Sequence, residues 1–336
     1  MRQQTDYSLL GHNTFGMDVR ARFFYEYDSE EELLQLLPQL PVDFPLLHIG
    51  AGSNLLFSGD FPGAVLHSAI RHIDCVAETD ETLLLRVGAG VVWDDFVAYT
   101  VDRSLGGAEN LSLIPGEVGA SAVQNIGAYG AEAKDIITQV EAIDLKTGQK
   151  RLFANADCQY AYRQSIFKNQ LKGKYAVTYV TYSLRKHPVL NLDYGDIRSH
   201  LPAATDSAFT VADVRRAIIA IRNEKLPDPK RLGNAGSFFM NPVVSHEQFQ
   251  TLRQSHPDMP HYEVPGGVKI PAGWLIDQCG WKGRSLGRAG VHDRQALVLV
   301  HRGGATPAEI VALSDAICQS VQQRFGISIR PEVNLI

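Results

Sequence analysis

The sequence predicts an α+β protein in which a strand-rich first half is followed by a smaller part where helices and strands alternate. Up to about residue 187, short apolar runs rich in Val, Ile, Thr and Tyr end in glycine turns. Turn-forming residues then gather in 187–202. The segment KLPDPKRLGNAG (225–236) holds two prolines and two glycines, which stop any helix and mark a domain boundary.

The first half begins with a helix after Ser29, because this serine can cap it, Glu32 stands three residues later, and Pro38 follows the apolar run. PLLHIGAGSNLL (45–56) and TLLLRVGAG (82–90) each predict a strand that enters a glycine loop. The β-branched and aromatic residues of 136–145 and 175–184 predict two further strands.

A helix is expected from Thr210, with Asp213 in the position that closes a capping box. A strand is expected at 296–300, followed by a helix that TPAE (306–309) opens and Gly326 ends. The expected buried faces are Val214, Ala217, Ile218 and Ile221 on the first helix and Ile310, Leu313, Ile317 and Val321 on the second.

The composition of the chain excludes several classes of function. The 336 residues suffice for two or three domains, and the formal charge of −5 comes without a basic stripe, so we expect no nucleic-acid partner. No apolar run approaches the roughly 18–20 residues of a membrane span, and the start of the chain is unlike a signal peptide, so a cytoplasmic protein without membrane contact is expected. Four isolated cysteines and eleven histidines without an HExxH pattern predict neither disulfides nor a metal site.

Two glycine-rich segments, GAGSNLL (50–56) and IPGEVGASAVQNIGAYG (114–130), are the candidate ligand loops. Glycines let backbone N–H groups approach a phosphate, although tight turns in a β-rich domain need them equally. The first segment is not a dinucleotide fingerprint, because Leu55 stands where the third glycine would fall. The amides of Gln124 and Asn125 among the glycines suit extended backbone along a flat ligand such as a flavin.

Taken in order, these motifs resemble a known family. An IGAGSNLL loop followed by IPGxxGAxxxQNIGAYG resembles the FAD-binding domain of the UDP-N-acetylenolpyruvoylglucosamine reductases, which share the wider fold of vanillyl-alcohol oxidase and p-cresol methylhydroxylase. The resemblance covers nearly the whole chain and continues in YRQSIFK (162–168), IRNEKLPDP (221–229), GNAGSFFMNP (233–242), PAGWLIDQCGWKG (271–283), HDRQALVLV (292–300) and RPEV (330–333).

The resemblance implies an FAD-binding fold of two α+β subdomains and a C-terminal α/β substrate-binding domain. The expected division is 1–60 for the first subdomain, joined by a final strand at 326–336, and 61–227 for the second. The tyrosine-containing insertion 187–202 resembles the extra element of the family's first type. Residues 228–325 then form the substrate-binding domain.

The implied reaction is the reduction of the enolpyruvyl ether of a UDP-amino sugar to UDP-N-acetylmuramate, a step of peptidoglycan precursor synthesis. NADPH is the implied hydride donor, FAD the non-covalent cofactor, and a monomer is expected. The implied cofactor-binding residues are Gly50, Ala51, Gly52, Ser53, Asn54, Leu55, Pro115, Gly116, Gly119, Ala120, Ser121, Gln124, Asn125, Gly127, Ala128 and Tyr129.

Three residues match the family's catalytic positions. Ser237 matches the proton donor to C2 of the enolpyruvyl group, with Phe238 and Phe239 as candidates to exclude water. Arg163 offers a planar fork to the substrate carboxylate, and Glu332 has a polarising or proton-relay role. From local sequence alone, a turn serine, an exposed arginine and a C-terminal ion pair remain open alternatives.

Five residues match substrate-contacting positions, and one position departs from the family. Lys225, Asn241 and Tyr194 match contacts to the UDP diphosphate, whereas Tyr162 and Gln295 match the pocket. Two alternatives stay open: an exposed helix-end lysine at 225, and a polar residue at the entry to strand 296–300 for Gln295. Met240 stands where many relatives carry lysine, and a thioether cannot bind phosphate as an ammonium does.

Two other functions compete with the reductase. A sugar or alcohol oxidase of the same fold often attaches its flavin to a His or Cys, and neither glycine segment contains either residue. A non-catalytic nucleotide-sugar or flavin-binding protein would have no use for Ser237, Arg163 and Glu332 together.

Overall fold

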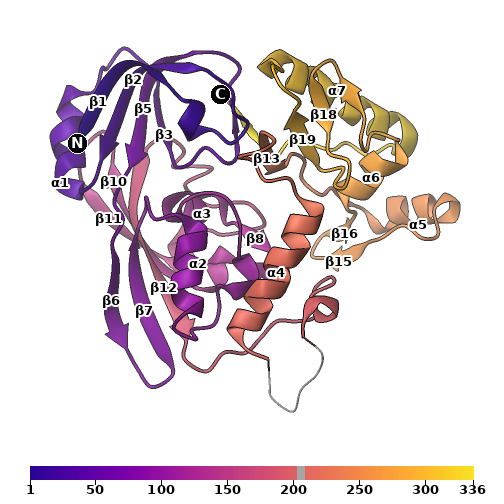
Figure 1. The fold of residues 1–336 in the computed structure, drawn as a ribbon, viewed down its shortest axis with the longest axis horizontal. Coiled ribbons are helices and arrows are strands. Elements are labelled where there is room, and N and C mark those ends of the chain that lie inside the picture. Colours follow the sequence, from indigo (N-terminus) through magenta and orange to yellow (C-terminus); the bar gives the residue numbers. More distant parts are fainter. Residues whose placement is uncertain (203–208) are drawn as a thin grey trace. The chain divides into compact units, whose positions relative to one another are not determined.

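The computed structural model describes residues 1–202 and 209–336, which form two compact units (Figure 1). Unit 1 consists of Met1–Tyr7, Ala21–Ala51 and Pro62–Arg222, and unit 2 of Ser8–Arg20, Gly52–Phe61 and Asn223–Ile336. The chain passes into the last part of unit 2 after Arg222, close to the proline-rich segment that predicts a boundary. The division into three domains stays a prediction.

A four-stranded sheet of order β1-β2-β5-β3 brings together the early strands of the chain. Helix α1 (Glu30–Leu36) begins as predicted, because the Ser29 hydroxyl accepts a hydrogen bond from the Glu32 N–H. The strands are β1 (Arg2–Ser8), β2 (Arg20–Tyr27), β3 (Leu46–Ile49) and β5 (Phe61–Ser68).

A five-stranded antiparallel sheet of order β11-β10-β12-β7-β6 forms the centre of unit 1. Its three middle strands are those that the sequence predicts, whereas the edge strands β6 and β11 are mostly exposed and lack the apolar pattern. Helix α3 packs on β12 and β7. The bounds are β6 (Ile73–Glu78), β7 (Thr82–Gly88), β10 (Ile137–Asp144), β11 (Lys150–Ala154), β12 (Tyr175–Arg185), α2 (Trp93–Val101), α3 (Val118–Gln124) and α4 (Val211–Lys225).

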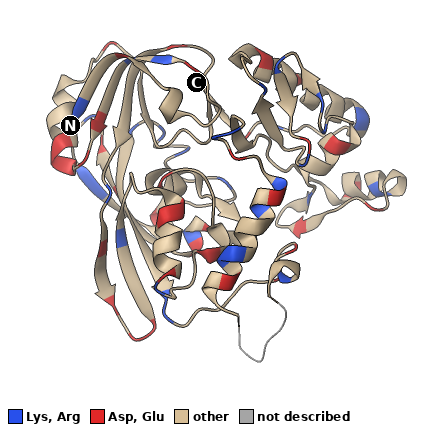
Figure 2. Cartoon of the chain, in the orientation of Figure 1, with Lys and Arg blue, Asp and Glu red and all other residues tan. Residues whose placement is uncertain are grey.

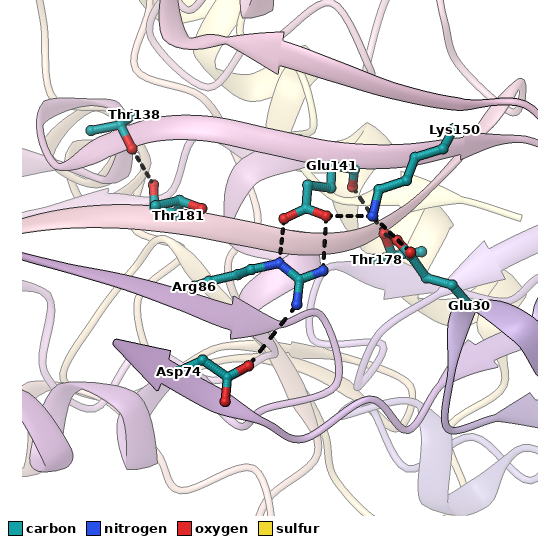
Figure 3. Close-up of polar contacts among 8 residues, drawn as sticks. All are labelled: Glu30, Asp74, Arg86, Thr138, Glu141, Lys150, Thr178 and Thr181. Carbon is teal, nitrogen blue, oxygen red and sulfur yellow. Dashed lines mark hydrogen bonds and ion pairs between the residues drawn. The ribbon is translucent and has the colours of Figure 1, made fainter. Parts of the chain in front are cut away.

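One side of this sheet carries a cluster of charges, drawn in Figure 3. The buried Glu141 carboxylate accepts two hydrogen bonds from Arg86, one of them at 2.8 Å, and pairs with the Lys150 ammonium at 2.6 Å. Lys150 also pairs with Glu30 at 2.7 Å, which ties α1 to the sheet. We call Glu30, Arg86, Glu141 and Lys150 the Glu141 cluster. Elsewhere, acidic and basic residues are interspersed along the chain (Figure 2).

The described part of unit 2 contains a four-stranded, a three-stranded and a two-stranded sheet, together with three α-helices. The capping box of α7, formed by Thr306 and Glu309, and its left-handed stop at Gly326 are confirmed. The smaller sheet of order β14-β16-β15 and helix α5 are additions that the sequence analysis does not predict. The bounds are β13 (Asn234–Ser237), β14 (Val243–Val244), β15 (Tyr262–Val264), β16 (Gly267–Lys269), β17 (Ser285–Leu286), β18 (Ala289–Val291), β19 (Val298–His301), α5 (His246–Ser255), α6 (Ala272–Gln278) and α7 (Pro307–Phe325).

The chain's final strand, β20 (Asn334–Leu335), pairs in parallel with β4 (Leu55–Leu56) in unit 2. None of the helices in the described ranges combines the length and the apolar character that crossing a membrane requires.

Candidate functional site

The second glycine segment has a strained backbone. Within residues 1–202 and 209–336, seven non-glycine residues have a positive φ, and three of them, Leu113, Asn125 and Tyr129, lie in or directly before this segment. A fourth, Arg163, contacts it with its side chain. Asn125 is also the left-handed C-cap of α3, a common role for asparagine. Left-handed backbone at bulkier residues such as Leu113 and Tyr129 is costly and occurs often at ligand sites, so the segment is a candidate ligand loop.

Glycines of this region also allow close packing between the loops themselves. A Cβ atom added at Gly119 would lie 2.8 Å from the Ala89 side chain, and one at Gly50 would lie 3.0 Å from the Glu117 carboxylate. A Cβ at Gly127 would lie 2.8 Å from the Arg163 guanidinium. At Gly119 and Gly127 a side chain would collide with neighbouring protein atoms, whereas at Gly50 the Glu117 side chain would only have to shift slightly. Close packing is thus a second reason for Gly119 and Gly127, beside the approach of a phosphate.

The YRQSIFK motif is bound to the second glycine segment along its length. The Arg163 guanidinium donates a hydrogen bond of 2.6 Å to the Gly127 carbonyl, and Lys168 donates one of 2.8 Å to the Gln124 side chain. The buried Ser165 hydroxyl donates to the Val123 carbonyl at 2.6 Å. Arg163 is thus a half-buried part of this segment rather than an isolated surface charge.

Two predicted cofactor-binding side chains are used by the fold. The buried Ser121 hydroxyl lies 3.0 Å from the Tyr182 hydroxyl, below α3. The buried Asn125 amide donates to Glu132 and to the Ala161 carbonyl, and its oxygen accepts from the Lys134 N–H. At these two positions, the side chain is therefore committed to the fold.

A buried histidine joins the second glycine segment to strand β5. His67 lies between two carboxylates, with its Nδ1 2.9 Å from Glu26 and its Nε2 3.1 Å from Glu117. Burial opposes the charge on His67, but the hydrogen bonds and charges of Glu117 and Glu26 outweigh it and raise its pKa. The sequence analysis missed this contact, although a lone histidine in the apolar run AVLHSAI was a visible signal.

The tyrosine-containing insertion is fastened to the end of the same segment. The Asn110 amide donates to the carbonyls of Tyr129 and Asn191, each at 2.9 Å, and the Asn191 amide donates to the Gly130 carbonyl at 3.1 Å. The ring of Tyr194 lies edge-on to that of Tyr129, with centroids 6.4 Å apart, and is 44% exposed. The structure thus brings Tyr194 beside the glycine segment.

Helix α4 presents two arginines to this region. Arg215 donates two hydrogen bonds, of 2.7 and 2.9 Å, to the Asp94 carboxylate, which also accepts from the Leu113 N–H. Burial opposes the charge on Asp94, but these contacts lower its pKa. Arg222 differs, because its buried Nε has no hydrogen-bond partner among the described residues. Burial lowers the pKa of Arg222, and the sequence analysis did not single it out.

In unit 2, a tight turn holds Ser237 at the end of β13. The Asn234 amide donates to the Leu232 carbonyl at 2.8 Å, its oxygen accepts from the Gly236 N–H at 2.9 Å, and Gly236 has a φ of +69°. The Ser237 side chain is exposed. Phe238 and Phe239 are buried core residues, and Phe238 packs on Phe15. Their expected role in excluding water stays a prediction.

Glu332 lies on the backbone segment next to Ser237. Its N–H donates to the Phe238 carbonyl at 2.7 Å, and its carbonyl accepts from the Asn54 amide at 3.3 Å. The structure therefore brings two of the three predicted catalytic positions together within unit 2, beside one residue of the first glycine segment.

The remaining predicted substrate residues have specific local roles. The Asn241 side-chain oxygen accepts from the Ala272 N–H at 2.9 Å and begins helix α6. The Gln295 side-chain oxygen accepts from the Leu297 N–H at 3.3 Å, as the interpretation of a polar residue before strand 296–300 requires. Lys225 is the exposed last residue of α4.

Tyr162, 36% exposed, lies under the Arg163 guanidinium at 5.0 Å, and Met240 is half-buried. No group of three or more His, Cys, Asp or Glu side chains suited to a metal ion occurs in the described part of the chain.

The comparisons with known proteins identify the family. Residues 22–151 match the FAD binding domain family, and residues 228–336 match the family described as UDP-N-acetylenolpyruvoylglucosamine reductase, C-terminal domain. The UDP-N-acetylenolpyruvoylglucosamine reductase of Bacteroides fragilis is 58% identical over 331 residues, which cover 98% of this chain and 99% of that protein. The chain belongs to the UDP-N-acetylenolpyruvoylglucosamine reductase family. The reductase of Porphyromonas gingivalis is 48% identical over 98% of both chains, and that of Neisseria gonorrhoeae is 48% identical over 99% and 97%.

A member of the reductase family with a solved structure shares the fold. The enzyme of Thermus caldophilus matches with a TM-score of 0.70 and 21% identity, covering 99% of this chain and 98% of its own. The predicted α+β fold, with an FAD-binding domain and this family's C-terminal domain, is confirmed. The chain is an FAD-dependent oxidoreductase of the reductase family.

The residues present fit a flavin. The second glycine segment has left-handed backbone at Asn125 and Tyr129, and the Nε of Arg222 in α4 is buried without a hydrogen-bond partner among the described residues. A ligand with a hydrogen-bond acceptor would satisfy that N–H group.

Proposed function

We propose that this protein reduces UDP-N-acetylenolpyruvoylglucosamine to UDP-N-acetylmuramate with NADPH, in the synthesis of peptidoglycan precursors. The observation that carries the proposal is the 58% identity to the Bacteroides fragilis reductase over almost the whole of both chains. The reaction adds a hydride to C3 of the enolpyruvyl group and a proton to C2, so one NADPH and one proton are consumed for each product.

FAD would be held without a covalent bond by residues 50–55 and 115–129, including the backbone around Gly116 and Gly119. When bound, it carries the hydride from NADPH to the substrate. The remaining work, which is to orient the substrate, stabilise negative charge and deliver a proton, falls to the protein.

Arg163 would bind the substrate carboxylate, into which charge spreads as C3 receives its hydride. Its guanidinium is held by the Gly127 carbonyl at 2.6 Å, and Lys168 donates to the Arg163 carbonyl at 3.2 Å. A guanidinium that is already in position needs little rearrangement when the transition state forms. It can therefore stabilise the negative charge that develops on the substrate at that point.

Ser237 would give its proton to C2. A free alcohol is a weak acid, but the carbanion-like centre at C2 is a strong base, so donation depends on position more than on a shifted pKa. The Asn234 turn supplies that position. Because the Ser237 side chain is exposed, bound substrate and cofactor would have to exclude water from it.

Glu332 would polarise the Ser237 hydroxyl or relay a proton to it. Its backbone is fixed on both sides, by the Phe238 carbonyl and by the Asn54 amide. The substrate diphosphate would meet Lys225, Tyr194 and Asn241, with Tyr162 and Gln295 in the pocket. Asn241 would use its amide N–H group, since its oxygen already holds α6.

The same proposal includes a cytoplasmic monomer, with the UDP-sugar and NADPH as its ligands. It also retains the division into 1–60 with 326–336, 61–227, and 228–325. Size-exclusion chromatography with light scattering would test the monomer.

The sharpest test of the mechanism is Ser237→Ala in anaerobic stopped-flow absorbance. NADPH should still bleach the flavin at the normal rate, because the hydroxyl has no part in that half-reaction. Reoxidation by the enolpyruvyl substrate should slow by about two to four orders of magnitude, the usual worth of a positioned acid. The exposed Ser285→Ala is the matched control and should behave as the parent protein.

Near-normal reoxidation of Ser237→Ala would remove this residue as the donor. Oxygen consumption with simple sugars, without NADPH oxidation in the presence of the enolpyruvyl substrate, would instead indicate an oxidase and overturn the proposed function.

A further inference from the structure

The Glu117 side chain lies where the two glycine segments meet. Glu117 belongs to the second segment and directly precedes α3, yet its carboxylate reaches the first segment. A Cβ atom added at Gly50 would lie 3.0 Å from the Glu117 Oε2 atom and 3.3 Å from the Ala120 side chain. Because Glu117 is 6% exposed, the position of a buried carboxylate determines how closely the two segments approach each other.

The imidazole of His67 holds this carboxylate in place. Its Nε2 lies 3.1 and 3.2 Å from the two Glu117 oxygens, and its Nδ1 lies 2.9 Å from a Glu26 oxygen. His67 is buried in β5 and is the parallel partner of Ile49 in β3, the residue before Gly50. His67, Glu117 and the start of the first glycine segment are therefore one packed group within unit 1.

The ring of His67 serves both carboxylates only when each of its nitrogens carries a proton. A neutral imidazole has one N–H group and one lone pair, whereas the imidazolium donates at both nitrogens. With a neutral ring, one carboxylate faces a lone pair and neither is balanced by a positive charge. Burial opposes the charge on His67, but the hydrogen bonds and charges of Glu117 and Glu26 raise its pKa above 6.5, so the charged ring predominates at pH 6.

Other titratable groups surround His67. The charged and titratable side chains that act on it or on its neighbours are Glu26, Tyr27, Glu30, His48 and Glu117. His48 stays neutral above pH 6, because burial lowers its pKa to about 4. Tyr27 lies 2.8 Å from His48 and stays protonated, because burial raises its pKa. A rise in pH from 6 to 9 therefore titrates His67 without titrating His48 or Tyr27.

We propose that His67 is a positioning residue for the flavin cofactor, acting through Glu117, and that its proton tightens the binding of FAD. The charged ring holds Glu117 beside Gly50 and balances its charge, so the two glycine segments keep the spacing that the cofactor needs. When the ring is neutral, an unbalanced anion lies between two segments that bind a ligand with two phosphate charges, and FAD binds more weakly. The inference rests on the proposed flavin site.

The pH dependence of FAD affinity tests the inference without any turnover. Flavin fluorescence measures the release of FAD as the holoprotein is diluted at several pH values from 6 to 9. The dissociation constant of the parent protein should rise about fivefold over this range, as expected when a hydrogen bond loses its charge. In His67→Gln, whose neutral amide cannot gain a proton, the constant should stay the same at every pH and exceed the parent value at pH 6 by about fivefold.

Two further measurements separate this role from a merely structural one. Glu26→Gln removes one of the charges that raise the pKa of His67, so the loss of FAD affinity should begin at a lower pH. By linkage, FAD must favour the proton on His67 as much as the proton favours FAD. An NMR titration of the His67 ring in the parent protein, assigned with His67→Gln, should therefore have its midpoint about 0.7 pH higher with FAD bound than without it.

His72→Gln is the matched control. His72 belongs to the same unit and is exposed, so this variant loses a titrating imidazole while the buried His67 and its two carboxylates remain. Its FAD dissociation constant should stay within about twofold of the parent value at every pH, because exposed charges are screened.

Several outcomes would overturn the inference. Parent protein whose FAD affinity is constant from pH 6 to 9 would do so, as would His67→Gln with the pH profile of the parent. Where His67→Gln fails to fold, the NMR titration of the parent protein decides, and an equal His67 midpoint with and without FAD refutes the coupling. Parent protein that binds no FAD would refute the proposed flavin site itself and is distinguished by its lack of colour.

Discussion

Two half-buried arginines of unit 1 differ in how the protein pairs their charge. In the Glu141 cluster, Arg86 is paired with a carboxylate, its guanidinium also lies 3.2 Å from the centre of the Tyr179 ring, and the hydrogen bonds to Glu141 raise its pKa (Figure 3). Beside the second glycine segment, Arg222 is half-buried, its buried Nε has no hydrogen-bond partner among the described residues, and desolvation lowers its pKa.

This difference in pairing distinguishes residues that stabilise the fold from residues whose partner would be a bound ligand. A charged side chain that is fully paired within the protein contributes to the fold. Removing one member of the pair leaves the other charge uncompensated. A charged group that is buried without a protein partner lowers the stability of the fold. Such a group is retained where a bound molecule supplies the missing hydrogen-bond partner. Three substitutions test this distinction.

The largest effect is expected for Glu141→Gln. Loss of this buried carboxylate leaves the half-buried Arg86 and the exposed Lys150 beside a neutral amide, so the free energy of unfolding should fall by about 2 kcal/mol, less than for a fully buried ion pair because water reaches both cations. Urea denaturation of the holoprotein measures this loss. The dissociation constant of FAD for the folded protein should be unchanged.

A double replacement tests whether the loss of stability in Glu141→Gln comes from the uncompensated charge of Arg86. Glu141→Leu combined with Arg86→Met removes both buried charges and should recover part of the stability that Glu141→Gln loses. If Glu141→Gln costs under about 1 kcal/mol, the Glu141 cluster is no more than a set of surface pairs, and the comparison with Arg222 fails.

A loss of similar size is expected for Gly119→Ala. The added methyl group would lie 2.8 Å from the Ala89 side chain, so α3 must shift, at a cost of about 2 kcal/mol. Because α3 lies within the second glycine segment, FAD should also bind more weakly, as fluorescence titration of the apoprotein would show. Gly59→Ala is the matched control, since nothing lies within 4 Å of its added Cβ. Equal FAD affinity in the two variants would separate α3 from the flavin site.

The smallest effect is a dependence of stability on pH that His67 carries. Its pKa is raised above the ordinary 6.5, so its charged hydrogen bonds to Glu26 and Glu117 contribute fully below about pH 6.5 and are lost as the pH rises through the folded-state value. The contribution should be about 1 kcal/mol, on the scale of a hydrogen bond to a charged group. Its neighbour His48, whose burial lowers its pKa to about 4, stays neutral across this window.

Denaturation curves at several pH values from 6 to 9 would measure the effect. His67→Gln should be less stable at pH 6 and should lack this part of the decline. A parallel decline in the variant and the parent protein would show that His67 does not carry it.

Local sequence predicts those parts of the fold that depend on neighbours in the chain. Ser29 and Thr306 cap their helices as expected, and the central strands follow from continuous apolar runs. The edge strands β6 and β11 were missed because their exposed residues carry no apolar pattern. Helix α5 was missed although Ser245 caps it, because Phe249 is its only buried residue.

The residues of the candidate site likewise fall into those that local sequence predicts and those that it does not. Ser237, Arg163 and Glu332 were found because ordered motifs surround them, and their local chemistry alone left other interpretations open. His67, Glu117 and Arg222 were not found, since their significance lies in contacts between segments distant in the sequence. Burial and pairing are properties of the folded chain, so the local sequence does not identify these contacts, although His67 stands out as a lone histidine in an apolar run.

The parallel pairing of Asn334 with Leu55 has a consequence for the order of folding. These two segments come from far apart in the sequence, and closing so long a loop is entropically costly and slow. We therefore expect their pairing, together with the bond from the Asn54 amide to the Glu332 carbonyl, to form late in folding. The first glycine segment and Glu332 would then reach their final positions in the same step. A partly folded chain would therefore have neither of them in place for the reaction.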